Sequence, residues 1–151
     1  MAKPYERDFF AWTQAQADAL KRRSVGELDW DNVREEIESL GKQERNELRS
    51  HLIVLLVHLL KWRLQPERRG RSWALSVKEQ RREIERLLRE NPSLQPQADE
   101  VLSEAYDIAV VRAARETDLP ESAFPDSAPF GLNEAMSLTI DWPEPGDGAG
   151  A

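Results

Sequence analysis

A run of apolar residues in the middle of the chain is the strongest feature of its hydrophobic pattern. Between Arg49 and Lys61 the only strongly polar positions are Ser50, His51 and His58. A surface helix would show a single apolar stripe, whereas this segment is apolar on all sides. At about a dozen residues, the run is shorter than the roughly 18 that a membrane span requires. We therefore predict a buried central helix.

A buried strand is the alternative for this segment, because it is rich in β-branched residues. The flanking residues favour a helix, because large apolar side chains recur at helical spacing. These are Leu48, Leu52, Leu55, Leu59 and Trp62. We place the central helix from about Lys42 to Leu64. Pro66 ends it, since the residue before a proline avoids the helical region.

Two helices are predicted before the central one. The first covers about residues 6–22, and its apolar face is formed by Phe9, Phe10, Trp12, Ala15, Ala19 and Leu20. The second begins after Asp29, an N-cap residue type. Its apolar residues Trp30, Val33, Ile37 and Leu40 repeat at heptad-like spacing. Gly41 either ends this second helix or kinks it.

Two further main helices follow the central one. The fourth starts at the cap residue Ser72 and ends at Asn91, before Pro92. The fifth starts at Ser93 and continues to about Thr117. Between the central and fourth helices lies a short loop that is rich in arginine.

The amino-acid composition changes after Pro120, where prolines and acidic residues become frequent. We predict an arm from about residue 118, held to the bundle by Phe124, Phe130 and Trp142, with a short helix at 132–138. The fold class is therefore all-α, a single-domain bundle of five main helices around the central apolar helix. The domain spans residues 1–142, and residues 143–151 form a disordered tail.

Composition limits the choice of compartment and chemistry. The chain has 151 residues, 40% hydrophobic and 32% charged, which is ordinary for a soluble helical domain. It has no cysteine, so disulfides and thiolate chemistry are excluded. The first residues lack the apolar stretch of a secretory signal, and we expect a cytoplasmic protein.

Charge is distributed unevenly along the chain. The net charge is −7, yet residues 61–90 carry ten basic and five acidic side chains. Residues 91–151 carry two basic and twelve acidic side chains. The basic block could bind a polyanion, or it could pair with acidic faces of the same fold.

The densest basic positions form a candidate recognition surface: Arg68, Arg69, Arg71, Arg81 and Arg82. Arginine suits contacts to phosphate or carboxylate. The internal alternative is that the acidic segment after Arg115 folds back and neutralises these arginines. Trp73 could stack on a base, but it lies on the apolar face of the fourth helix. No helix-turn-helix or other nucleic-acid module is recognisable.

The two histidines are weak metal candidates. His51 and His58 lie about 10.5 Å apart along a helix axis, so one ion is not expected to bind both. Glu47 and His51 are neighbours that could share an ion, with Glu36 or Glu38 adding a ligand. We instead expect His58 and Glu36 to form a buried polar pair in the core. We predict no metal site, no cofactor and no catalytic residue.

Several motifs resemble one known family. Residues 58–62 (HLLKW), 65–69 (QPERR), 71–73 (RSW) and 79–82 (EQRR) carry most of the likeness. Residues 5–9, 35–41 and 91–94, with the late Leu-Pro and Phe-Pro pairs, add to it. The chain resembles, from residue 5 to about 138, the bacterial domain-of-unknown-function family twenty-nine, common in cyanobacteria and proteobacteria. The resemblance implies an all-α bacterial protein, with no activity, cofactor or catalytic residue attached.

Three functional hypotheses remain from the sequence. The leading one is a non-enzymatic interaction or accessory protein that binds a protein partner through a helix face or the arginine loop; self-association is compatible with it. The second is a nucleic-acid-associated factor that uses the 61–90 block. The third is a metal-dependent enzyme using His51, His58 and carboxylates of the second helix. An enzyme is disfavoured, because no phosphate loop, nucleophile elbow or zinc-protease motif occurs.

Overall fold

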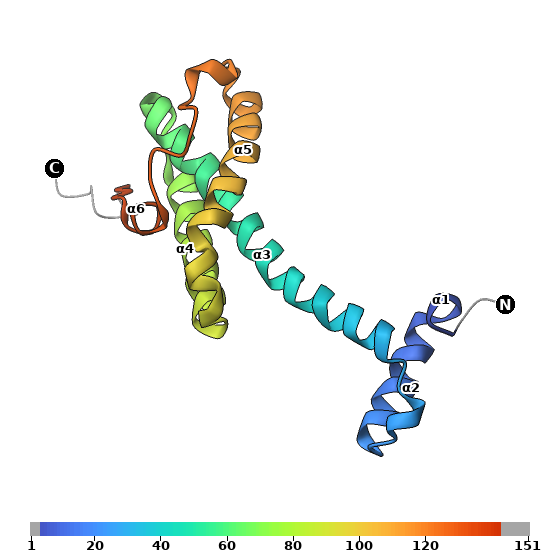
Figure 1. Cartoon of the computed structure of the whole chain (residues 1–151). Coiled ribbons are helices and arrows are strands. Elements are labelled where there is room, and N and C mark those ends of the chain that lie inside the picture. The colour runs from blue at the N-terminus through green and yellow to red at the C-terminus, as the bar shows by residue number, and fades with distance from the viewer. Residues whose placement is uncertain (1–3, 143–151) are drawn as a thin grey trace. The chain divides into compact units, whose positions relative to one another are not determined.

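The computed structural model describes residues 4–142, and within that range all regular structure is helical (Figure 1). The all-α class is therefore confirmed. The chain divides into two compact units, Met1–Gln43 and Glu44–Ala151, and each is described by itself. The single domain over residues 1–142, with its arm from about 118, stays a prediction. The predicted disordered tail, residues 143–151, lies outside the described residues.

The first unit begins with two short helices rather than the single helix predicted over residues 6–22. Helix α1 covers Pro4–Arg7, and α2 covers Phe9–Lys21. Asp8 separates them because it is the N-cap of α2, and its side chain accepts a hydrogen bond from the Ala11 amide at 3.0 Å. That bond satisfies one of the amides that a helix start leaves without a partner. A 3₁₀ turn, η1 (Val25–Glu27), follows.

Helix α3 runs without interruption over Trp30–Leu64, 35 residues. Of the two outcomes left open at Gly41, an end of the helix is therefore excluded, and the predicted second and central helices are one helix. A glycine costs only about 1 kcal/mol relative to alanine in a helix, and good helix formers flank it on both sides. A Cβ atom at Gly41 would meet nothing within 4 Å, so packing does not require glycine there. Pro66 begins the turn η2 (Pro66–Arg68), and α3 ends at Leu64 as predicted.

The core of the second unit is built around the C-terminal half of α3. Helix α4 (Arg71–Glu90) and helix α5 (Ala98–Thr117) pack beside it (Figure 1). The α3 side chains Leu48, Leu52, Leu55 and Leu56 are all 0% exposed. Opposite them lie the buried residues Val77, Ile84 and Leu87 of α4 and Val101, Ala105 and Ala109 of α5. The predicted central helix is thus confirmed as the centre of this unit.

Two helix starts differ from those predicted. Helix α4 begins at Arg71 with Gly70 as its N-cap, not at a Ser72 cap. Helix α5 begins at Ala98, because residues from Pro92 to Gln97 form the 3₁₀ helix η3. Prolines at positions 92 and 96 have no amide hydrogen to donate, and the tighter 3₁₀ geometry suits such short connecting pieces.

The segment after α5 packs on the second unit through the predicted anchors. Phe124 and Phe130 are buried, at 4% and 7% exposure. The short turn η4 (Glu121–Ala123) and helix α6 (Leu132–Ser137) lie in this segment, and α6 confirms the predicted short helix. Trp142 is only partly covered, at 42% exposure, and meets Trp62 edge to face with 6.4 Å between ring centroids.

Truncating Leu55 tests the assignment of the core. We expect Leu55→Ala to lower the free energy of unfolding by about 2–5 kcal/mol, because the side chain is fully buried and its loss leaves a cavity. Leu40→Ala is the matched control: Leu40 is 61% exposed, and its change should stay within about 0.5 kcal/mol. Urea unfolding of both variants gives the comparison. A loss below about 1 kcal/mol for Leu55→Ala would contradict a core centred on α3.

Candidate functional site

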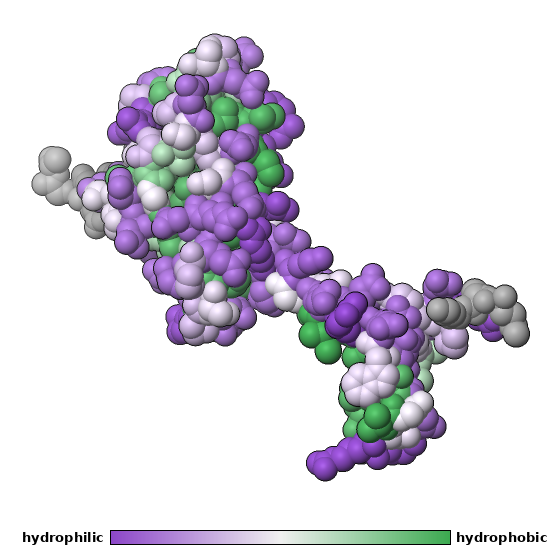
Figure 2. Space-filling model, in the orientation of Figure 1, coloured by the Kyte–Doolittle hydropathy of each residue, from purple (hydrophilic) through white to green (hydrophobic). Residues whose placement is uncertain are grey.

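The first candidate site is an exposed row of apolar side chains on α3, which we call the apolar stripe: Trp30, Ile37 and Leu40. These residues are 60%, 62% and 61% exposed. Their spacing of seven and three places them on one helix face. Phe10, Leu20 and Val25 of the same unit are also more than half exposed. Figure 2 shows such hydrophobic residues, in green, at the surface of the first unit.

The apolar faces predicted for the first two helices are thus mostly uncovered. Of the hydrophobic residues that the structure describes in the first unit, only Trp12 and Ala19 are buried. Trp12 donates its Nε1 hydrogen to Asp29 at 3.0 Å, and Gln16 accepts from the Asp29 amide at 2.7 Å. These contacts tie α2 to the start of α3. The periodic pattern predicted apolar faces correctly but not whether the chain covers them.

Glu36 has a partner in the first unit and not in a buried core. The Tyr5 hydroxyl donates a hydrogen bond to Glu36. That bond, followed by desolvation and the negative charge of Glu36, raises the pKa of Tyr5 to about 12. The predicted pairing of His58 with Glu36 is therefore wrong. His58 Nδ1 lies 2.8 Å from the Val54 carbonyl oxygen, an acceptor one turn earlier in the same helix.

The five candidate arginines do not share one environment. Arg69 is half-buried, donates from Nε to the Trp62 carbonyl at 2.6 Å, and lies 5.1 Å from the Trp62 ring centroid. It satisfies one of the last carbonyls of α3, which have no partner within the helix. Arg81 does the same for α6, donating to the carbonyls of Ala135 at 3.0 Å and Leu138 at 2.7 Å.

Arg68, Arg71 and Arg82 are exposed at the surface. The acceptors of Arg69 and Arg81 are backbone carbonyls, and that of Arg69 belongs to α3. Neither contact is the neutralisation by acidic side chains after Arg115 that was the internal alternative. Recognition of an anionic partner by the exposed arginines stays a prediction.

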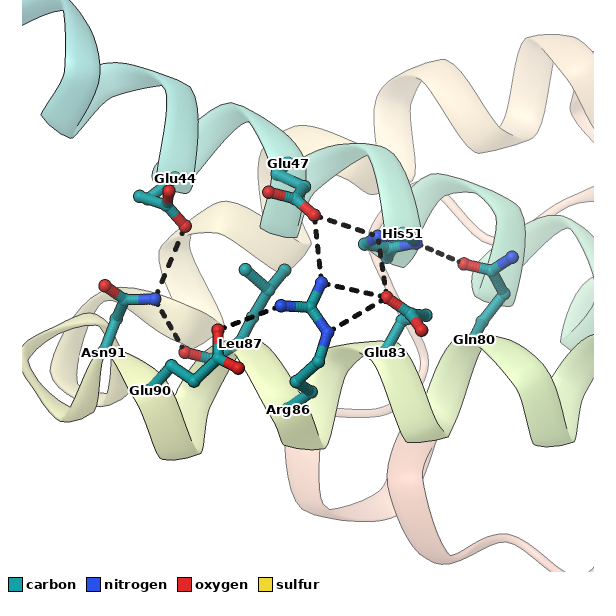
Figure 3. A network of polar contacts seen from close by, with 9 residues as sticks. All are labelled: Glu44, Glu47, His51, Gln80, Glu83, Arg86, Leu87, Glu90 and Asn91. Carbon is teal, nitrogen blue, oxygen red and sulfur yellow. Dashed lines mark hydrogen bonds and ion pairs between the residues drawn. The ribbon is translucent and has the colours of Figure 1, made fainter.

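A polar network between α3 and α4 is the second candidate site (Figure 3). At its centre, Arg86 of α4 points toward α3 and donates from Nη2 to Glu47 at 3.2 Å and to Glu83 at 2.9 Å. His51 Nδ1 lies 2.7 Å from Gln80 Oε1, and His51 Nε2 lies 3.7 Å from Glu47. The hydrogen bond to Glu83 comes first among the contacts that raise the pKa of Arg86. The network joins the two helices by charge as well as by packing.

Three groups of this network could hold a metal ion. One oxygen each of Glu47 and Glu83 and one ring nitrogen of His51 lie within 4.8 Å of one another. The Glu47–His51 pair was readable from its i, i+4 spacing. Glu83 was not, because it comes from another helix, and no sequence signal links it to the pair. His58 and the carboxylates Glu36 and Glu38 are not part of this group.

The position of Arg86 weakens the case for a metal. Zinc needs oxygen and nitrogen ligands at about 2.0–2.2 Å, and the two carboxylates already share a guanidinium. A metal ion would have to replace that cation and draw the three ligands closer together. The arrangement serves better as an ion-paired contact between helices.

Comparison with known proteins adds one finding. A family model described as "Domain of unknown function DUF29" matches residues 4–142. No curated protein and no solved structure matches the chain. Among the described residues, no helix combines the length and the apolar character needed to cross a bilayer.

Replacing single arginines separates structural from surface roles. We expect Arg69→Gln to lower the free energy of unfolding by about 1.5 kcal/mol, because it removes a charged hydrogen bond to the end of α3. Arg68→Gln removes the same charge from an exposed neighbour and should change stability by less than about 0.5 kcal/mol. Thermal and urea unfolding measure both variants. Equal losses for the two would contradict the distinction.

Zinc titration tests the polar network. We expect the wild-type chain to bind no stoichiometric zinc, because Arg86 occupies the position between the carboxylates. Arg86→Ala should bind zinc more tightly than wild type, and adding Glu83→Gln should abolish the gain. Calorimetry and elemental analysis are the measurements. Stoichiometric metal in the purified wild-type protein, lost in His51→Ala, would overturn this assignment.

Proposed function

The chain belongs to the DUF29 family, a domain of unknown function, and from that premise we propose that it is a non-enzymatic interaction protein that docks a partner helix on the apolar stripe. The observation that carries the proposal is the exposure of Trp30, Ile37 and Leu40, about three-fifths of each residue, on one face of α3. Contiguous exposed apolar residues on a helix mark interaction surfaces.

The packing of the first unit supports the proposal that a partner covers the apolar stripe. A unit of some 40 residues with only Trp12 and Ala19 buried, among those described, has little hydrophobic stabilisation of its own. Burying apolar area contributes roughly 25 cal/mol per Å². Covering three large side chains would therefore stabilise the unit appreciably. Folding and binding of this unit are then linked.

The spacing and charge of the stripe indicate what kind of partner fits. Trp30, Val33, Ile37 and Leu40 alternate by three and four residues, the spacing with which helices interlock side by side. Residues 29–44 carry six acidic and two basic side chains. A complementary surface is therefore an amphipathic helix with basic flanks. Two copies of this stripe would instead bring like charges together.

The rim of the stripe is polar, as interface rims are. Arg34 and Glu38 form an exposed i, i+4 ion pair at 3.7 Å, with side chains 74% and 60% exposed. Such a pair adds little stability by itself. It leaves the apolar stripe as the main source of binding free energy.

Site-specific photo-crosslinking tests this function. A photoreactive residue at position 37 should capture one protein in the native host, through a peptide that forms a basic amphipathic helix. The same residue at position 35, about 200° away around the helix, should not. Leu40→Glu should abolish capture from position 37 while leaving the helical circular dichroism unchanged, since Leu40 is exposed. Equal capture from both positions, or capture only of a second copy of the chain, would contradict the proposal.

A further inference from the structure

A cationic pocket lies in the second unit, between α4 and the residues that follow α6. Its volume is about 420 Å³. Its charged lining consists of Arg71, Lys78, Arg81, Arg82 and Glu85, all from α4. Residues at spacings of three, four and seven share one helix face, so this set is one continuous strip of α4. Four cations and one carboxylate give the pocket a positive charge in a chain whose net charge is −7.

Two of these cations have no carboxylate partner within the part of the chain that the structure describes. Lys78 and Arg82 are exposed, and neither forms an ion pair with a residue between 4 and 142. Some cations of this unit are paired: Arg45 makes a two-pronged contact with Glu104 at 2.9 and 3.0 Å, and Lys61 lies 3.4 Å from Glu116. What distinguishes Lys78 and Arg82 is that they line one pocket together with two further cations.

Arg81 adds a fixed and partly desolvated charge. Its Nε and Nη2 groups donate to the carbonyls of Ala135 and Leu138, which hold the guanidinium against the end of α6. Burial lowers the pKa of Arg81, with the charge of Glu85 acting in the opposite direction. A carbonyl oxygen accepts a hydrogen bond but carries no full charge. An anion in the pocket would stabilise this guanidinium further.

The rest of the pocket lining is apolar and aromatic. It consists of Ala74, Leu75 and Val77 of α4, and of Ile140 and Trp142, which follow α6. The edge-to-face contact with Trp62 holds the Trp142 ring, while 42% of Trp142 stays exposed. A volume of some 420 Å³ lies in the range of small-molecule sites. The pocket combines phosphate-binding side chains with a ring on which a planar group can stack.

We propose that this pocket binds a nucleoside phosphate, with the phosphates on the cations of α4 and the base against Trp142. The ligand is a small molecule and not a nucleic acid, because the cations line a pocket of limited volume between two segments. This site is separate from the apolar stripe, and its occupancy does not depend on the docking proposal. It also gives the exposed Arg82 a partner of defined chemistry.

Calorimetric titration of the full chain with ATP, tripolyphosphate and adenosine tests the site. At about 0.15 M salt, ATP should bind one to one with a Kd below about 100 μM. Tripolyphosphate should bind more weakly, and adenosine more weakly still. Lys78→Gln with Arg82→Gln should weaken ATP binding at least about tenfold. The matched pair Arg89→Gln with Arg112→Gln removes the same charge from exposed positions outside the pocket lining and should change the Kd by less than about twofold.

Trp142 distinguishes recognition of a base from simple attraction of phosphate. Trp142→Ala should weaken ATP binding but not tripolyphosphate binding, and Trp142→Phe, which keeps a ring, should retain most of the ATP affinity. Absence of ATP binding up to about 1 mM would overturn the proposal. Equal weakening by the matched arginine pair would overturn it as well. Tripolyphosphate binding as tightly as ATP would remove the nucleoside from the assignment.

Discussion

Burial of the C-terminal half of α3 is the interaction on which the second unit depends. Leu48, Leu52, Leu55 and Leu56 are wholly removed from water, and α4, α5 and the segment after α5 all contribute side chains to the same cluster. Each such leucine contributes roughly 1.5–3 kcal/mol when it leaves water. The small alanines of α5, Ala105 and Ala109, have no exposed surface and let the helices approach closely. The polar contacts of the unit lie around this cluster and make the packing of the helices more specific.

The same helix has a different character in each unit. Its later part is enclosed, whereas Trp30, Ile37 and Leu40 in its earlier part are more exposed than buried. A helix of 35 residues is about 52 Å long, and its length alone allows two environments. Exposed apolar area is unfavourable in water, and the proposed docking of a partner helix would remove this cost. The contrast between the two parts of α3 is the observation on which that proposal rests.

Charged residues serve the architecture in two distinct ways. Arg69 and Arg81 complete the carbonyl ends of α3 and α6, and Arg86 joins α3 to α4 through two carboxylates. Lys78 and Arg82 have no such role among the described residues, although they lie on the same helix as Arg81 and Arg86. Within one helix, therefore, some cations make contacts that hold the fold together, and others make no ion pair with a described residue.

The amino-acid sequence by itself determined what depends on neighbours within a few residues. Apolar periodicity identified the central helix, Pro66 marked its end, and the i, i+4 spacing paired Glu47 with His51. The helix break at Asp8 was not predicted, and the passage of α3 through Gly41 was left open, because either outcome differs by only about 1 kcal/mol locally. Tertiary structure alone decided which apolar faces are covered, that Glu83 joins Glu47 and His51, and that Arg81 binds the end of α6. These features bring together residues that are distant in the chain, and periodicity shows that a face is apolar or charged without showing what lies against it.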